Sequence, residues 1–257
     1  MNRMLVIALS LMALSGFLLA DDHSSSNGYV VESIPFKLKE GSTMADMMEL
    51  APQFAKLGKK GKFQYSSYIL TPHYITKSTA AVASDYDGVW LGFSPDNKSM
   101  TSAVSYYLKN GMDLENNFGE VRIMNQRMLM RGEQIHDAGI ELDSDDSGYT
   151  VIRTCSLNEG SDMDDFRAAA KRRSDEFNEA GLTVEPHIWH SGFGIPNELQ
   201  GKMLLVFYYP DMAEWAKLGD MYFDGKFSQD TQEMVAKAVT CGPARSYLTS
   251  PFYAVSN

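Results

Sequence analysis

The same order of apolar and polar segments occurs twice along the chain. Strand-like alternation over residues 28–38 and 148–157 is followed in each half by a stretch of helical period. Two more apolar segments and a Pro-Asp turn come next, then a second amphipathic helix and a last strand-like segment. The pattern predicts strand–helix–strand–strand–helix–strand in both halves, which is the order of the ferredoxin-like unit.

Short matching stretches support this duplication. LKEGSTMADM, which begins at Leu38, and LNEGSDMDDF, which begins at Leu157, share Leu, Glu, Gly, Ser, Met and Asp at the same positions. Further along, the tetrapeptides PHYI and PHIW match, and this match pairs His73 with His187. If a twofold axis relates the two halves, we expect it to relate these two histidines as well.

The starts of the helices can be predicted from the same stretches. Thr43 with Asp46 and Ser161 with Asp164 have the spacing of a capping box at the first helix of each half. Pro52 lies inside the first predicted helix. Because proline has no backbone N–H to donate, we expect a late start, a kink or a break there.

These patterns define the boundaries along the chain. We expect a first repeat over residues 28–135, an acidic linker over 136–147 and a second repeat over 148–257. Residues 1–20 have the positive start and apolar run of a secretory signal peptide, and residues 21–27 are expected to form a disordered N-terminus. An uncleaved membrane anchor is the alternative for the first segment.

Signal cleavage implies an exported protein, either periplasmic or extracellular. Cleavage after Ala20 would leave Asp21, Asp22 and His23 at the N-terminus, with nitrogen ligands suited to copper(II). This short motif often arises by chance. The sequence contains no paired-cysteine zinc motif, nucleotide-binding glycine loop or nucleophile elbow, so we expect no metal site beyond this weak candidate.

The chain is acidic, with a formal net charge of −10. An acidic surface repels phosphate backbones, so we expect no nucleic-acid partner. After the N-terminal segment no stretch is long and apolar enough to span a bilayer, so we expect no membrane contact once the signal is cleaved. The oligomeric state is left open by the sequence.

Two cysteines are present, Cys155 and Cys241. In the ferredoxin-like unit the first and fourth strands are adjacent and antiparallel. Cys155 lies near the end of the first predicted strand of the second half, and Cys241 lies just before the fourth. The topology therefore brings them together, and an exported location would allow a disulfide. Two buried free thiols are the alternative.

A four-stranded unit covers only one face of its sheet with helices, so the other face must be buried elsewhere. Two units in one chain can bury these faces by packing sheet against sheet. In this respect the repeat resembles the dimeric α/β-barrel superfamily, with both halves fused in one polypeptide over nearly all of residues 28–257. The Glu-Gly-Ser and Pro-His repeats are also similar to those of small exported proteins of uncharacterised function with this fold.

The resemblance implies an α+β fold of two tandem βαββαβ repeats that form an intramolecular barrel. The superfamily includes haem-handling enzymes, cofactor-free monooxygenases and small-molecule degraders, and its haem-binding members have an axial histidine. No histidine of this chain can be given that role by motif, so the catalytic residues and any cofactor stay unassigned.

The candidate ligand-binding residues are two histidines and two tryptophans: His73, His187, Trp90 and Trp189. Histidines related by a twofold axis could line a common cavity between the sheets. In the alternative interpretation the Pro-His pairs only close strands and the tryptophans only pack in the core.

Three functions remain open on this basis. The first is non-catalytic binding of a small apolar or aromatic ligand between the sheets. The second is an enzyme of the superfamily's oxidative type, either haem-dependent or a cofactor-free monooxygenase. The third is a structural or protein-interaction role at the cell surface. Fold alone cannot choose among them, because function depends on the site.

Overall fold

The computed structural model describes residues 28–75, 86–124, 126–140 and 147–254. The predicted signal peptide and the copper candidates Asp21, Asp22 and His23 lie outside these residues. The first half contains β1 (Gly28–Leu38), α1 (Met44–Met48), α2 (Ala51–Gly61), β2 (Ser66–Pro72), β3 (Gly88–Ser94), α3 (Asn97–Asn110), α4 (Met112–Val121), β4 (Arg122–Met124) and β5 (Met128–Gln134). The second half contains β6 (Gly148–Leu157), α5 (Met163–Glu179), β7 (Glu185–Phe193), the 3-10 helix η1 (Asn197–Leu199), β8 (Met203–Tyr209), α6 (Met212–Phe223), α7 (Gln229–Ala238), β9 (Val239–Cys241) and β10 (Arg245–Tyr253).

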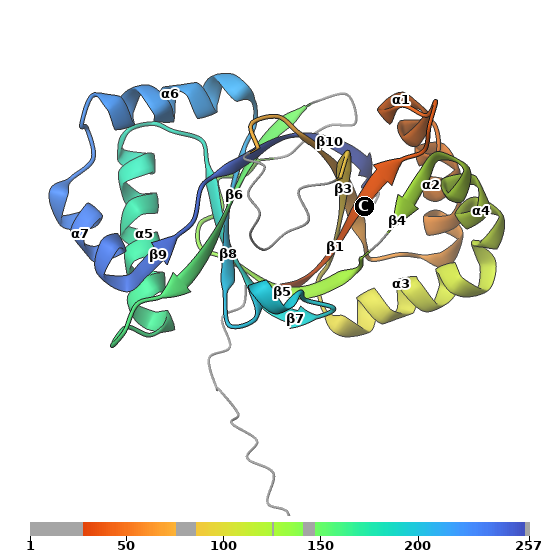
Figure 1. The fold of residues 1–257 in the computed structure, drawn as a ribbon, viewed down its shortest axis with the longest axis horizontal. Coiled ribbons are helices and arrows are strands. Elements are labelled where there is room, and N and C mark those ends of the chain that lie inside the picture. Colours follow the sequence, from red (N-terminus) through yellow and green to blue (C-terminus); the bar gives the residue numbers. More distant parts are fainter. Residues whose placement is uncertain (1–27, 76–85, 125, 141–146, 255–257) are drawn as a thin grey trace, which may run out of the picture.

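The long strands form one closed antiparallel barrel. The first half contributes β2-β3-β1-β5 and the second contributes β7-β8-β6-β10, which is the ferredoxin-like strand order in both. Hydrogen bonds between β5 and β7 and between β10 and β2 join the two sheets edge to edge. The predicted fold is therefore confirmed, and in Figure 1 α1–α4 flank one side of the ring and α5–α7 the other.

The two faces of every strand have different neighbours, because successive side chains point to opposite sides. The inward faces meet in an apolar cluster that fills the middle of the barrel. It includes Val31, Leu70, Leu91, Met130, Ile152, Trp189, Val206 and Tyr247. The outward faces pack under the helices, around Phe36, Trp90 and Phe118 in the first half and around Phe166 and Phe177 in the second.

The first helix of the first half begins as predicted. Thr43 and Asp46 form a capping box, and the helix is broken into α1 and α2, with Pro52 in the first turn of α2, where its missing N–H costs nothing. In the second half the predicted capping pair is wrong by one residue. Asp162 caps α5 through the amides of Asp164 and Asp165, while the Ser161 hydroxyl donates to the carbonyl of Lys237.

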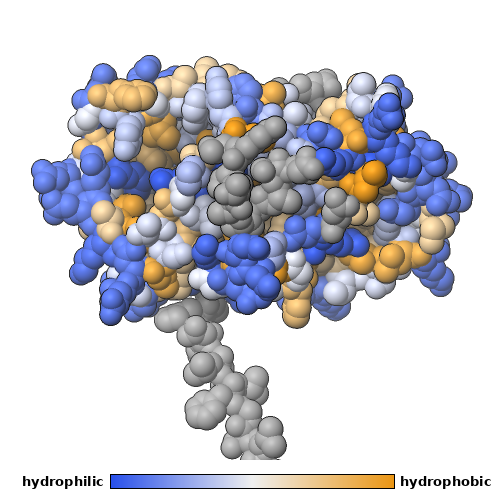
Figure 2. Space-filling view, in the orientation of Figure 1, coloured by the Kyte–Doolittle hydropathy of each residue, from blue (hydrophilic) through white to orange (hydrophobic). Residues whose placement is uncertain are grey.

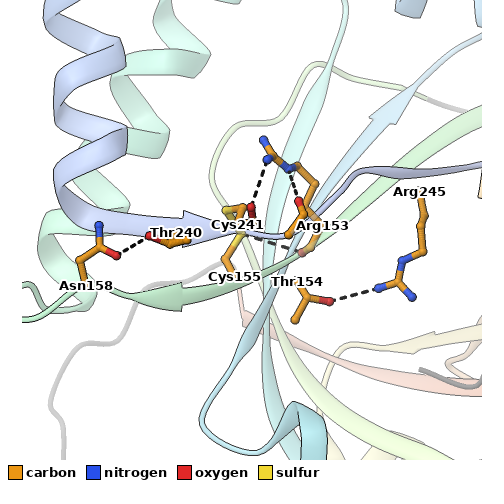
Figure 3. Close-up of a disulfide and its surroundings, with 8 residues drawn as sticks. Arg153, Thr154, Cys155, Asn158, Thr240, Cys241 and Arg245 are labelled. Carbon is orange, nitrogen blue, oxygen red and sulfur yellow. Dashed lines mark hydrogen bonds between the residues drawn. A yellow bond between two sulfur atoms is a disulfide. The ribbon is translucent and has the colours of Figure 1, made fainter. Parts of the chain in front are cut away.

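The predicted disulfide is confirmed. Cys155 on β6 lies directly opposite Cys241 on β9, with 4.0 Å between the Cα atoms and a bond between the sulfur atoms. Figure 3 shows Arg153 beside it, with its guanidinium donating to the Gly242 and Cys241 carbonyls at 3.1 and 3.4 Å. The disulfide therefore joins β6 to the segment that leads into β10.

The face of the molecule drawn in Figure 2 is mixed in character. Figure 2 shows hydrophilic residues over both helix layers, with hydrophobic residues in small separate patches. A search of the described residues for a helix with the length and apolar character of a membrane span finds none.

Candidate functional site

A cavity of about 250 Å³ lies inside one end of the barrel. Both halves line it. The lining includes Ser66, Tyr68 and Phe93 from the first half and Thr150, Tyr208 and Thr249 from the second. The segment that joins the two halves contributes Ile140. A ligand in this cavity would therefore be held by strands of both repeats.

Strand β7 supplies the chemically active side of the cavity. Glu185, His187 and Trp189 alternate with Pro186 and Ile188, so the period of the strand brings the first three onto the inward face. Glu185 and His187 line the cavity, and Trp189 lies next along the strand in the apolar middle of the barrel. This places a carboxylate, an imidazole and an indole in a row.

Tyr29 of β1 links two of these side chains. Its hydroxyl lies 2.7 Å from His187 Nδ1 and accepts a hydrogen bond of 2.9 Å from Trp189 Nε1. An indole N–H can only donate, so the Tyr29 oxygen is the acceptor for Trp189. If the Tyr29 hydroxyl in turn donates its proton to His187 Nδ1, all three groups have a partner, and we adopt this assignment. Burial raises the pKa of Tyr29, which keeps that proton on the hydroxyl. With Nδ1 accepting, the proton of the imidazole ring lies on Nε2.

Glu185 holds the segment between the halves against the cavity. Its Oε1 accepts from the backbone amides of Ala138 and Ile140 at 3.2 and 3.0 Å. Its Oε2 lies 3.6 Å from His187 Nε2, which is too long for a hydrogen bond. Part of the predicted linker is thus tied to the barrel by a carboxylate that also faces the imidazole.

Two polar atoms at the cavity have no hydrogen-bond partner within the described part of the chain. They are His187 Nε2 and the Tyr208 hydroxyl, and both are buried. By contrast, Thr150 and Thr249 pair with each other at 2.6 Å. Burial raises the pKa of Tyr208 well above its ordinary value, so its hydroxyl stays protonated. Buried polar groups are normally hydrogen-bonded, so two buried donors without partners indicate a place for a ligand atom that accepts them.

His73 is not the counterpart of His187. β3 and β8 each end at the residue directly before a Pro-Asp turn. Their next-to-last residues, Phe93 and Tyr208, are therefore equivalent. Ser66 pairs with Phe93 and Glu185 with Tyr208, so Tyr68 occupies the position of His187. His73 follows β2, where its Nδ1 lies 3.0 Å from the Tyr149 hydroxyl. The Pro-His match therefore does not reflect structural equivalence, because the register of the strands differs from that of the motif.

The two candidate tryptophans lie on opposite faces of the barrel wall. Trp189 points inward, toward Tyr29, whereas Trp90 points outward under the helices of the first half and donates to the Tyr65 hydroxyl at 2.6 Å. The structure thus brings together His187 and Trp189 and leaves His73 and Trp90 elsewhere. Sequence reasoning missed Tyr29, Glu185 and Tyr208. The alternation in Glu-Pro-His-Ile-Trp could have identified Glu185, but nothing local identifies a tyrosine from the other half.

The described residues contain no cluster of three or more His, Cys, Asp or Glu side chains that could hold a metal ion. Nor does the cavity suit haem. Its volume of about 250 Å³ lies below the range of pockets for drug-sized molecules, and a porphyrin is larger than these. The His187 nitrogen that could serve as an axial ligand faces Glu185 at 3.6 Å. The cavity fits a molecule with about one aromatic ring.

Solved structures with the same fold support the architecture. A putative chlorite dismutase is 12% identical, with a TM-score of 0.50, over 88% of this chain and 96% of its own. A putative monooxygenase from Lactobacillus acidophilus NCFM is 8% identical, with a TM-score of 0.51, over 88% and 95%. A variant of the chlorite dismutase from Candidatus Nitrospira defluvii is 9% identical, with a TM-score of 0.50, over 89% and 93%.

No family model and no curated protein matches the sequence. At such low identities the structural likeness establishes the fold: the chain is a dimeric α/β barrel whose two halves are joined in one polypeptide. The activities named for those proteins are not transferred by it.

Proposed function

We propose that this protein binds a small aromatic molecule with a hydrogen-bond acceptor in the cavity inside the barrel, without transforming it. The observation that carries the proposal is the pair of buried donors, His187 Nε2 and the Tyr208 hydroxyl, that lack partners at the cavity. A bound hydroxyl or carbonyl oxygen would satisfy a donor whose desolvation otherwise costs about 1–3 kcal/mol. The aromatic walls of Tyr29, Tyr68 and Phe93 would stack against the ring.

An exported location belongs to the same proposal. The disulfide between Cys155 and Cys241 is the structural support for it, since such bonds persist in oxidising compartments. In a binding protein that captures small aromatic molecules outside the cytoplasm, this bond would hold β6 to β9 within the second half.

One arrangement favours a second candidate function, an enzyme of the cofactor-free oxidative type. His187 is oriented by Tyr29 at Nδ1 and faces Glu185 with Nε2, as a general base held between two polar groups would be. In this role the ring proton would lie on Nδ1 and be donated to the Tyr29 oxygen, which leaves Nε2 free to take a proton from a bound phenol. Oxygen consumption in the presence of the protein and an added phenol, and its loss in His187→Gln, would favour the enzyme over the binding protein.

The binding proposal can be tested by isothermal titration calorimetry with phenol and fluorobenzene, which have similar shapes. The wild-type protein is expected to prefer phenol, because only phenol offers an oxygen to the buried donors. Tyr208→Phe is expected to reduce this preference by about tenfold, the effect of one buried hydrogen bond near 1.4 kcal/mol.

Tyr222→Phe is the matched control, because Tyr222 lies on α6 and is 71% exposed. It should leave the preference unchanged. A wild-type protein that binds neither probe, or a Tyr208→Phe variant with the full preference for phenol, would refute the proposal.

A further inference from the structure

A second cavity, of about 230 Å³, lies outside the barrel in the first half, between the sheet and the helices α2, α3 and α4. Its walls are largely apolar and aromatic, with Phe54, Phe63, Trp90 and Phe118 among them. It is separated from the first cavity by the barrel wall, since Trp90 belongs to the outward-facing cluster. We refer to it as the outer cavity.

Four charged side chains line the outer cavity, and three of them are satisfied by one another or by tyrosines. Glu32 is 4% exposed, and its two oxygens accept from Arg127 at 2.7 Å and from Tyr65 at 3.0 Å. Glu115 accepts from the Tyr107 hydroxyl at 2.6 Å. These contacts account for both carboxylates and for one of the two guanidinium groups.

The fourth charged group is Arg122, which is different. It is only 7% exposed, and its Nε and Nη1 are buried without a hydrogen-bond partner in the described part of the chain. Its guanidinium lies 4.5 Å from the ring centre of Phe118 and 5.6 Å from that of Trp90. Aromatic faces attract a cation but offer no acceptor for its N–H groups. Burial accordingly lowers the pKa of this guanidinium.

The fold does not require polar residues at these strand positions, because the second half has aliphatic residues there. According to the strand pairings, Val151 corresponds to Glu32, Leu205 to Trp90 and Val239 to Arg122. All three are buried under the helices of the second half. A buried charge is costly unless it is paired, so a charge at these strand positions in the first half only points to a role other than stability.

The mouth of the outer cavity lies at the junction of α3 and α4. The lining side chains of Leu108 and Met112 are 64% and 60% exposed, and they flank Gly111, where one helix follows the other. Arg127 lies toward solvent as well, with its side chain 49% exposed. A ligand could therefore enter past two flexible apolar side chains and reach the buried guanidinium.

We propose that the outer cavity is a second binding site, for a small apolar or aromatic carboxylate whose oxygens accept the unused N–H groups of Arg122. A carboxylate supplies the acceptor that these N–H groups lack and adds its charge to that of nearby Glu115, while the aromatic walls take the apolar part. The site binds through a charge-assisted hydrogen bond, the stronger kind in proteins.

The test uses phenylacetate as the probe and phenylacetamide, its neutral analogue, as the control ligand. By isothermal titration calorimetry the full-length protein is expected to bind phenylacetate more tightly. Arg122→Leu imitates the aliphatic layer of the second half and is expected to weaken phenylacetate binding by about tenfold to a hundredfold, the range for a hydrogen bond to a charged group. Arg172→Leu, on α5 and away from the cavity, is the matched control and should bind as the wild type does.

A second measurement locates the probe without any substitution at Arg122. In methyl spectra of the wild-type protein, phenylacetate should shift the resonance of Met112, which lines the outer cavity, and leave that of Met130, inside the barrel, in place. Equal affinity for phenylacetate and phenylacetamide, full binding by Arg122→Leu, or a shift confined to Met130 would overturn the proposal.

Discussion

The hydroxyl of Tyr29 and Nδ1 of His187 lie 2.7 Å apart, although the two residues belong to different halves of the chain. Tyr29 is on the first strand of the first repeat and His187 on the second strand of the second. Their contact forms because β5 pairs with β7 and thereby brings β1 within reach of the second sheet. The cavity is therefore a product of the closed barrel and of neither half alone.

The contact at Tyr29 should matter to stability. Tyr29→Phe leaves Trp189 Nε1 and His187 Nδ1 without their partner, and each stranded buried group costs about 1–3 kcal/mol. Guanidinium unfolding should show a loss of about 2–6 kcal/mol, the sum for the two groups. Tyr222→Phe, at an exposed position, should stay within about 0.5 kcal/mol of the wild type. Equal stability of Tyr29→Phe and the wild type would show that the hydrogen bonds contribute nothing.

The disulfide should be a large part of the stability of the second half. Its closed loop spans a sequence separation of 86, for which loop entropy gives about 4–5 kcal/mol. The Cys155→Ala/Cys241→Ala variant should unfold at correspondingly lower guanidinium concentration. A reductant should destabilise the wild type and have no effect on the variant. If reduction leaves the unfolding of the wild type unchanged, the bond does not stabilise the fold.

Glu133 should make stability depend on pH below its ordinary titration range. Hydrogen bonds from His190 and Arg167 lower the pKa of this carboxyl from 4.5 to about 2. A depressed pKa in the folded state adds stability that is complete above pH 4.5 and is lost as the pH falls toward 2. Glu133→Gln should be less stable than the wild type at neutral pH, and the difference should shrink over this window.

Chemical unfolding at several pH values measures that difference. Glu159→Gln is the matched control, because Glu159 is exposed in the turn before α5, and its difference from the wild type should be small at every pH. A difference for Glu133→Gln that stays constant from neutral pH to pH 2 would contradict the assignment.

The halves should not be independent. A fragment of residues 24–140 would expose the edges of β2 and β5, which in the whole chain pair with β10 and β7. Unpaired edges recruit other strands, so the fragment should self-associate in size-exclusion chromatography with light scattering. Mixing it with residues 141–257 should recover a one-to-one complex. A stable monomer of the first fragment would contradict this account.

The order of elements could be predicted from the sequence because strands and helices leave different periods, and the repeat doubled that signal. The disulfide followed from strand order alone. Strand register could not be predicted in this way, and His73 shows why. The spacing between Leu38 and Leu157 also relates Tyr68 to His187, whereas the tetrapeptides PHYI and PHIW match at a different spacing.

The cavities lay further beyond the reach of the sequence. Tyr29 meets His187 only through the β5–β7 edge, and the isolation of Arg122 depends on which groups its neighbours already bind. Each of these facts requires three-dimensional positions of residues that are far apart along the chain. Local patterns predict which elements form and leave open which polar groups lack a partner.

In the proposed function, the cavity inside the barrel binds a small aromatic molecule through His187 and Tyr208. Crystals of the protein grown with 4-bromophenol would test it directly, because bromine can be located by its anomalous scattering. A bromine peak is expected inside the barrel, with the phenol oxygen within about 2.6–3.2 Å of His187 Nε2 or the Tyr208 hydroxyl. A cavity without the ligand at saturating concentration, or bromine only outside the barrel, would contradict it.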